Sequence, residues 1–284
     1  MKITQNIMLI SSVSLLAFSC GNKETESHEA EQTAVVAQDT TPVTVDDTTK
    51  FKFDFTIANI PSPANAMQEF ASWKVAYDNS ILNNPQSANK YSTEFKRSLN
   101  LGVYNIDMAY AMMNNKGPDV IAYMKSILQV SDALGLKSAL DAMIGKRAEA
   151  NLNSKDSLFT ILDDIFVKSD SYLRTNERVY TASTVFAGSW IENLYLCSKL
   201  GTQVTDAAAK ESVHRHLWDQ RFHLSNLINL LNDYKSKKEC AELVASLKPI
   251  LDEITAIHEV AEMSDEKFAS IGNKIIAIRN KVVE

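Results

Sequence analysis

Apolar residues recur every three or four positions along most of the chain beyond residue 63. One such stripe runs from Leu99 to Met113, and others lie within 158–166 and 224–231. This spacing places the apolar side chains on one face of an α-helix, the face that packs on a core. The pattern predicts helices at 64–79, 89–114, 118–134, 137–151, 155–175, 177–200, 205–235, 238–261 and 264–282.

Glycine and proline punctuate this helical pattern. The chain contains only 8 glycines and 6 prolines, and several of them, such as Gly117-Pro118, Gly135 and Gly201, lie at the boundaries of predicted helices. Pro249 lies inside the eighth predicted helix, which we expect it to kink or split. These features predict an all-α domain of about nine helices in antiparallel hairpins, arranged as a bundle or a short solenoid-like array without a substantial sheet.

The pattern differs before residue 64. Residues 20–50 are rich in Thr, Glu, Asp and Ala and contain no aromatic residue. Because such a segment buries too little apolar surface to order itself, a disordered linker is predicted. Phe51, Phe53 and Phe55 alternate with polar residues, which predicts an extended arm packed on helices in preference to a lone strand. The helical domain is therefore expected to cover 51–284.

The first twenty residues have the composition of an export signal. Lys2 precedes an apolar run from Ile7 to Phe18, and Ser19-Cys20 follows. A charged start, a short apolar stretch and a small residue before the cut are typical of a secretory signal peptide. The run is shorter than the roughly 20 residues that span a bilayer. An ordinary signal peptide with a chance cysteine is one alternative.

The cysteine at the cut is the more specific feature. Residues 17–20 (Ala-Phe-Ser-Cys) resemble a bacterial lipoprotein signal, in which the cysteine receives acyl chains, palmitate among them, and becomes the mature N-terminus. Phe18 departs from the small residue that such signals prefer. Residues 1–19 are then a signal peptide, and several acyl chains on Cys20 anchor the protein far better than one chain.

A short charged segment follows the cysteine. Residues 23–26 (Lys-Glu-Thr-Glu) resemble the surface-export signal of Bacteroidota lipoproteins. This resemblance implies an outer-membrane lipoprotein that faces either the periplasm or the cell surface. The alternative is a solvated charge cluster, which leaves the lipid anchor unchanged.

The charge balance limits the possible partners. The chain has 29 basic and 35 acidic residues, and removal of Lys2 with the signal takes the net charge from −6 to −7. Mild acidity argues against nucleic acid as a partner and against broad adhesion to anionic lipid. No cofactor is expected.

Two cysteines remain after lipidation of Cys20. Cys197 and Cys240 both lie in apolar, helical contexts. An oxidising compartment permits a disulfide between them, although two buried thiols are the simpler interpretation. The sequence leaves both alternatives open.

Two segments, 102–110 and 188–195, share a pattern. Each has a glycine within a predicted helix, an aromatic residue two positions later, then an acid and a tyrosine. Glycine within a helix costs about 1 kcal/mol relative to alanine, so we expect another helix backbone to pass close to each glycine. The acids are Asp107 and Glu192, and each is surrounded by apolar or aromatic residues at helical spacing.

Two interpretations of these acids compete. In the structural one, each carboxylate accepts hydrogen bonds from tyrosine hydroxyls or a helix N-terminus and fixes the packing of two related halves. In the functional one, the acids and the neighbouring aromatic residues converge on a pocket. The candidate pocket residues are Tyr104, Asp107, Tyr110, Trp190, Glu192 and Tyr195.

The same segments carry a resemblance to a family. Residues 60–63 (Ile-Pro-Ser-Pro), the Gly-x-Tyr-x-x-Asp-x-x-Tyr helix at 102–110, residues 134–136 and residues 188–192 resemble uncharacterised helical lipoproteins of Bacteroidota. The resemblance spans about residues 55 to 205. It implies a location and a helical fold, and no activity.

One predicted helix face carries two histidines and an acid, which could form a metal site. His216, Asp219 and His223 lie on one face of a predicted helix, and two imidazoles with a carboxylate are zinc ligands. However, the two histidines are about 10 Å apart along a straight helix axis, too far for one metal ion. A solvated face of mixed charge is the simpler interpretation.

The function predicted from the sequence is a membrane-anchored envelope lipoprotein that binds a protein or glycan partner without catalysis. The chain has no Gly-x-Ser-x-Gly motif, no phosphate loop and no His-Glu-x-x-His motif. The alternative is a hydrolase or metal-dependent enzyme that uses Asp107 and Glu192 or the face of His216, Asp219 and His223. An open cleft holding both acids would favour the enzyme, and buried, paired acids would favour a structural role.

Overall fold

The computed structural model describes residues 47–58, 63–136 and 178–284, together with eight single positions between 147 and 173. Every regular element in these parts is a helix, which confirms the predicted all-α fold. Short 3-10 helices lie at Asn79–Ile81, Pro85–Lys90, Asn232–Tyr234 and Val260–Glu262. The α-helices are α1 (Asp47–Ala58), α2 (Pro63–Ser72), α3 (Glu94–Met113), α4 (Gly117–Ala133), α7 (Val179–Gly201), α8 (Ala207–Leu231), α9 (Lys238–Thr255) and α10 (Asp265–Val282).

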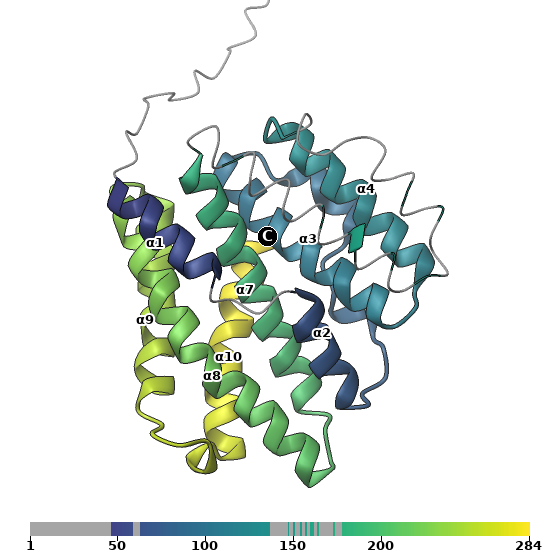
Figure 1. The fold of residues 1–284 in the computed structure, drawn as a ribbon, viewed down its shortest axis with the longest axis vertical. Helices are drawn as coiled ribbons and strands as arrows, with labels where there is room; N and C mark the ends of the chain where they lie inside the picture. The colour runs from purple at the N-terminus through teal and green to yellow at the C-terminus, as the bar shows by residue number, and fades with distance from the viewer. Residues whose placement is uncertain are drawn as a thin grey trace, which may run out of the picture. The chain divides into compact units, whose positions relative to one another are not determined.

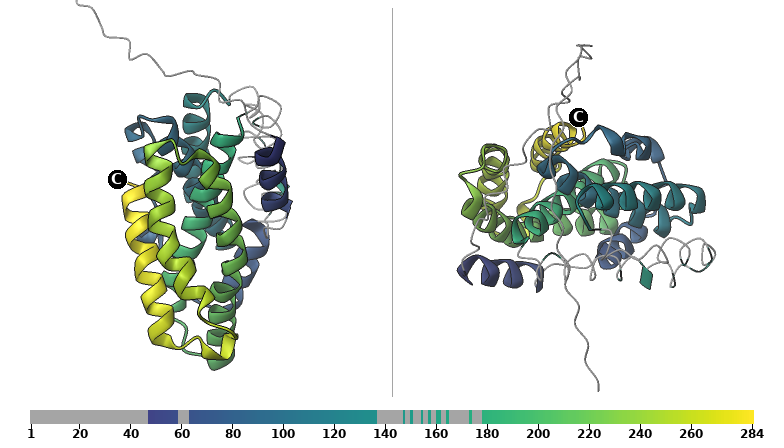
Figure 2. Two further views of the ribbon diagram at one scale, coloured as in Figure 1. Left: turned by 90° about the vertical axis from the view of Figure 1, so that its left-hand side faces the viewer. Right: turned by 90° about the horizontal axis from the view of Figure 1, so that it is seen from above.

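Helices α3 and α7 form the centre of the fold and pack against each other along much of their length (Figure 1). α4 packs on α3, and α10 packs on α7. α8, α9 and α10 follow one another as neighbouring antiparallel helices (Figure 2). The arrangement agrees with the predicted hairpins, although the predicted helices at 137–151 and 155–175 fall almost wholly outside the described residues.

Two glycines allow α3 and α7 to approach so closely. A Cβ atom on Gly102 would lie 2.1 Å from the backbone oxygen of Val185, and one on Gly188 would lie 1.9 Å from that of Leu99. Both distances are far below van der Waals contact, so only glycine fits at either position. The predicted close helix contact is confirmed, and the two similar segments turn out to be each other's partners.

Side-chain caps determine where several helices begin. Thr93, Asp206 and Ser264 each precede a helix, and their side-chain oxygens accept a hydrogen bond from the N–H three residues later, at 3.1, 2.9 and 3.3 Å. Such caps satisfy backbone donors that the first turn leaves free. They place the starts of α3 and α8 two to five residues later than the apolar pattern predicted.

The prediction for residues 47–58 was wrong. They form helix α1, not the end of a linker followed by an extended arm. Thr49, Phe53 and Thr56 are buried at helical spacing, with 7%, 1% and 2% of their surfaces exposed. The alternation of three phenylalanines suggested a single apolar face, but Phe53 faces the core while Phe51 and Phe55 face outward.

Two helix ends also differ from the prediction. Helix α9 runs through Pro249 without being split and ends at Thr255, six residues early. Pro249 and Ala245, whose carbonyl oxygen has no helical N–H partner at Pro249, are both exposed, so the lost hydrogen bond lies on the solvent side of the helix. α2 ends at Ser72, since Lys74 adopts a left-handed backbone conformation with φ 56°. No helix in the described part of the chain has the length and apolar character needed to cross a bilayer.

Candidate functional site

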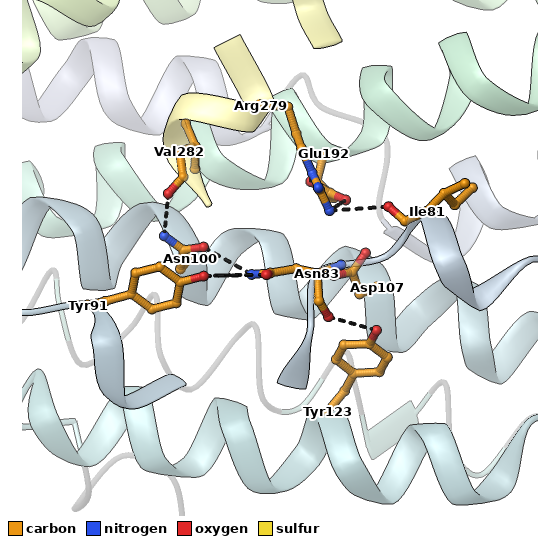
Figure 3. Close-up of polar contacts among 9 residues, drawn as sticks. All are labelled: Ile81, Asn83, Tyr91, Asn100, Asp107, Tyr123, Glu192, Arg279 and Val282. Atoms are coloured by element: carbon orange, nitrogen blue, oxygen red, sulfur yellow. Dashed lines mark hydrogen bonds and ion pairs between the residues drawn. The ribbon is translucent and has the colours of Figure 1, made fainter. Parts of the chain in front are cut away.

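The two predicted acids lie together in the centre of the molecule. Asp107 on α3 and Glu192 on α7 follow the contact glycines by about one helical turn, so the close packing of these helices brings their carboxyl groups into contact. Neither residue has any exposed surface. Figure 3 shows both side chains beneath Arg279, which reaches them from α10.

Arg279 forms a two-point ion pair with Glu192. Its Nε lies 2.9 Å from Glu192 Oε2 and its Nη2 lies 3.0 Å from Oε1. The guanidinium also donates to the backbone oxygen of Ile81 at 3.3 Å and lies 4.2 Å from the centre of the Tyr195 ring. Burial raises the pKa of Glu192, and the charge of Arg279 and its two parallel charge-assisted bonds oppose this effect and favour the carboxylate form.

Asp107 has a different environment. Its Oδ2 accepts a hydrogen bond from the backbone N–H of Asn83 at 3.0 Å, whereas Oδ1 receives none from any described donor. Burial, and then the negative charge of Glu192, raise the pKa of Asp107 well above its usual range. Because the single Arg279 guanidinium balances only one carboxylate, we assign Asp107, whose carboxyl group contacts that of Glu192, as the protonated member of the pair.

A polar network continues from this pair to four other parts of the fold. The Asn83 amide nitrogen donates to Tyr91 at 3.0 Å and to Asn100 at 3.1 Å, and Asn100 donates to the carbonyl of Val282 at 2.8 Å. Tyr123 on α4 donates to the Asn83 carbonyl at 3.0 Å (Figure 3). Buried polar groups are tolerated because they are paired in this way.

Three residues of the network were not predicted from the sequence: Asn83, Asn100 and Arg279. Arg279 had a readable signal, since apolar residues occupy the positions three and four away on both sides of it. A charged residue at the centre of such a stripe indicates a buried partner of opposite charge. Asn83 had no comparable signal, because it lies in a loop.

The aromatic residues of the candidate pocket do not hold the acids. Tyr104 donates to the carbonyl of Asn84 at 3.0 Å, and Tyr110 stacks on Tyr77 with ring centres 5.1 Å apart. The expected donors were tyrosine hydroxyls or a helix N-terminus, whereas Asp107 accepts from the Asn83 backbone and Glu192 accepts from Arg279, so the expectation of tyrosine donors was wrong. All six candidate pocket residues, Tyr104, Asp107, Tyr110, Trp190, Glu192 and Tyr195, are at most 5% exposed, which favours a core role.

The histidine face is also occupied by structural contacts. His216 Nδ1 lies 2.7 Å from Glu69 Oε2, and its Nε2 lies 3.3 Å from the Asn193 amide. Asp219 Oδ1 lies 3.5 Å from Arg221 Nη1. Within the described residues, no group of three His, Cys, Asp or Glu side chains is placed to hold a metal ion. His216, Asp219 and His223 therefore do not come together as a metal site.

The two cysteines of the helical domain are free thiols. Cys197 and Cys240 are both fully buried and do not form a disulfide, which resolves the alternative left open by the sequence. Cys240 donates to the carbonyl of Leu231 at 3.3 Å. Burial raises the pKa of Cys240 to about 11 and that of Cys197 well above its usual value, so neither is a thiolate nucleophile at neutral pH.

A scan against protein-family models, a search of curated proteins and a search of solved structures each found no match to this chain. Its function is therefore inferred from its own residues.

Proposed function

We propose that this protein is an envelope lipoprotein, anchored in the outer membrane by acyl chains on Cys20, whose helical domain binds a protein or glycan partner without catalysing a reaction. The anchor is supported by the apolar run that ends at Cys20. The segment Lys23 to Glu26 supports export toward the cell surface.

The proposal that the domain catalyses no reaction rests on the burial of Asp107 and Glu192. A general acid or base must come within hydrogen-bond reach of its substrate. Asp107 and Glu192 have no exposed surface, and their polar atoms face Arg279, the Asn83 backbone and each other. This is the observation that most favours a binding or scaffold protein over a hydrolase.

Metabolic labelling tests the anchor. Cells that express the full-length protein would be grown with an alkyne analogue of palmitate, and label and membrane association would be measured for the wild type and for Cys20→Ser. We expect the substitution to abolish labelling and to move the protein out of the membrane fraction. Cys240→Ala, which removes a buried thiol, is the control and should keep the label. Labelling that survives in Cys20→Ser would exclude the anchor.

Protease treatment of intact cells tests surface display. Added proteinase K should degrade the wild-type protein while a periplasmic marker survives. Replacing residues 23–26 by neutral residues should protect the protein from the protease and leave labelling at Cys20 unchanged. A wild-type protein that resists the protease until the cells are lysed would place the domain in the periplasm.

Crosslinking in intact envelopes tests the binding role. The protein would be recovered after crosslinking under denaturing conditions, and partners would be compared with those of an unrelated lipoprotein of similar abundance. A reproducible partner, whether protein or glycan, is the expected result. Repeated recovery of the protein alone would contradict the proposal.

A further inference from the structure

A groove lies between helices α1 and α8, on the part of the molecule where the structure departed most from the sequence prediction. Its volume is about 370 Å³, within the range of roughly 300–1,000 Å³ that is usual for small-ligand sites. α1 supplies one wall, and the last turns of α8 with the residues that follow supply the other. The lining residues are Phe51, Lys52, Phe55, Thr56, Asn226, Asn229, Asn232 and Asp233.

The α1 wall presents two aromatic rings. Phe51 and Phe55 are 69% and 51% exposed, and their rings are stacked with centres 6.4 Å apart and planes inclined by 25°. Phe53, between them in sequence, is 1% exposed and packs in the core. Leaving two adjacent phenylalanine rings in water is unfavourable, and exposed apolar patches of this kind mark binding sites.

The opposite wall presents amides. Asn226, Asn229 and Asn232 follow one another at intervals of three residues. Within the described part of the chain, their side chains form no hydrogen bond with another residue. Each amide has a carbonyl oxygen that accepts and an NH₂ group that donates. The groove therefore offers paired donors and acceptors opposite an apolar surface.

The charges in the groove neutralise each other. Lys52 Nζ lies 2.7 and 2.9 Å from the two carboxylate oxygens of Asp233, and Thr49 also donates to Asp233 at 2.7 Å. The Thr56 hydroxyl donates to the Lys52 carbonyl at 2.7 Å. Since the one lysine and the one aspartate of the lining are paired with each other, the groove has no unbalanced charge for an ionic ligand.

We propose that this groove binds a neutral saccharide. A sugar ring has an apolar C–H face, which suits the exposed faces of Phe51 and Phe55, and hydroxyl groups at its edge, which both donate and accept as the amides do. An acyl chain or an apolar helix would leave the three amides without partners. A protein partner ordinarily buries about 800 Å² on each side, more than a groove of this volume supplies. The inference rests on the proposed binding role and names its ligand class.

Calorimetry on the intact protein tests the inference. The mature, lipidated chain would be studied in a detergent without a sugar headgroup and titrated with chitotetraose, cellohexaose, maltohexaose and mannohexaose. We expect at least one of them to bind with a Kd of about 5 mM or tighter. Phe51→Ala combined with Phe55→Ala should weaken that binding at least about 10-fold, and Asn229→Ala about 5-fold.

Matched controls separate the groove from the rest of the surface. Phe222→Ala removes a phenylalanine on α8 that is 61% exposed and does not line the groove, and Asn280→Ala removes an exposed asparagine on α10. Both should bind like the wild type. The circular dichroism spectrum and the melting temperature of each variant show whether it has folded, and Asn229→Ala decides the question if the double phenylalanine variant does not fold.

Three results would overturn the inference. The first is the absence of any heat of binding with the four oligosaccharides at about 10 mM. The second is binding that is unchanged in the groove variants. The third is a photo-crosslink between position 229 and the chain's own residues 21–43 that added saccharides do not displace. Failure of the anchor, seen as palmitate labelling that survives in Cys20→Ser, is a separate result. If the protein is lipidated but binds no saccharide, only the inference about the groove is contradicted. If it binds a saccharide but is not lipidated, only the anchor is contradicted.

Discussion

At the scale of single residues, Arg279 balances the charge of the core. It is the partner of Glu192, and Asp107 remains neutral beside them. A buried ion pair contributes little net stability compared with apolar residues, because both charges lose their hydration. Removing only one member is different, since the other charge then remains buried without compensation.

Substitution of Arg279 tests this balance. Arg279→Leu should lower the free energy of unfolding by roughly 3–5 kcal/mol, because the Glu192 carboxylate loses its counter-charge. Urea unfolding followed by circular dichroism measures the change. Lys281→Leu, at an exposed position of the same helix, should change it by less than about 0.5 kcal/mol. Equal effects of the two substitutions would mean that Arg279 has no special role.

A pH series tests the protonation of Asp107. Its pKa is raised in the folded state, so the folded protein holds this proton more tightly than the unfolded chain. Its contribution to stability is therefore fully present below the unfolded pKa of about 3.9 and is lost as the pH rises toward the folded value. Asp107→Asn, which mimics the protonated acid, should lack this loss. The stability of the wild type relative to Asp107→Asn should fall by up to about 1.4 kcal/mol per pH unit above pH 4. Parallel curves would show that Asp107 is not the group that holds the proton.

At the scale of elements, the α3–α7 contact is the feature on which the site depends. Gly102 and Gly188 let the two backbones touch, and that contact places the carboxyl groups one turn further along against each other. Any side chain at these positions would separate the helices. The acidic pair, and the Arg279 contact above it, would then lose their geometry.

Alanine at the contact tests this dependence. Gly188→Ala would bring a Cβ atom within 1.9 Å of the Leu99 carbonyl oxygen, and we expect a loss of about 3 kcal/mol or more, since backbone cannot move aside as a flexible side chain does. Gly272→Ala is the matched control, because its Cβ would lie 3.1 Å from the hydroxyl of Ser198. It should change stability by no more than about 1 kcal/mol. Thermal and urea unfolding of both variants provide the comparison.

Helix α1 is attached to the rest of the fold partly by hydrogen bonds to Asp233. Thr49 and Lys52 both donate to Asp233, which links α1 to the end of α8. Asp233→Ala should leave the global unfolding transition almost unchanged and speed hydrogen exchange of the α1 amides, because local contacts hold this helix. Asp252→Ala, at an exposed position of α9, is the control. Unchanged exchange in α1 would show that the contacts with Asp233 do not hold the helix.

At the scale of the whole molecule, the described fold agrees with the helical periods read from the sequence. The stripe from Leu99 to Met113 predicted α3, and the two mid-helix glycines predicted a close contact, because both signals arise within one helix. The period failed in α1, where three phenylalanines suggested an alternation but only Phe53 packs inward. The helical spacing of apolar residues also does not show which helices pack against each other.

The sequence by itself therefore determined the helical class, the two glycine contact points and the apolar setting of both acids, since each depends on residues only three or four positions apart. Only the tertiary structure decided that Asp107 and Glu192 meet, and that Arg279, 87 residues after Glu192, neutralises the pair. It likewise joined the exposed rings of Phe51 and Phe55 to the amides of α8 in one groove. Such pairings depend on how distant helices pack, and no local spacing encodes that choice.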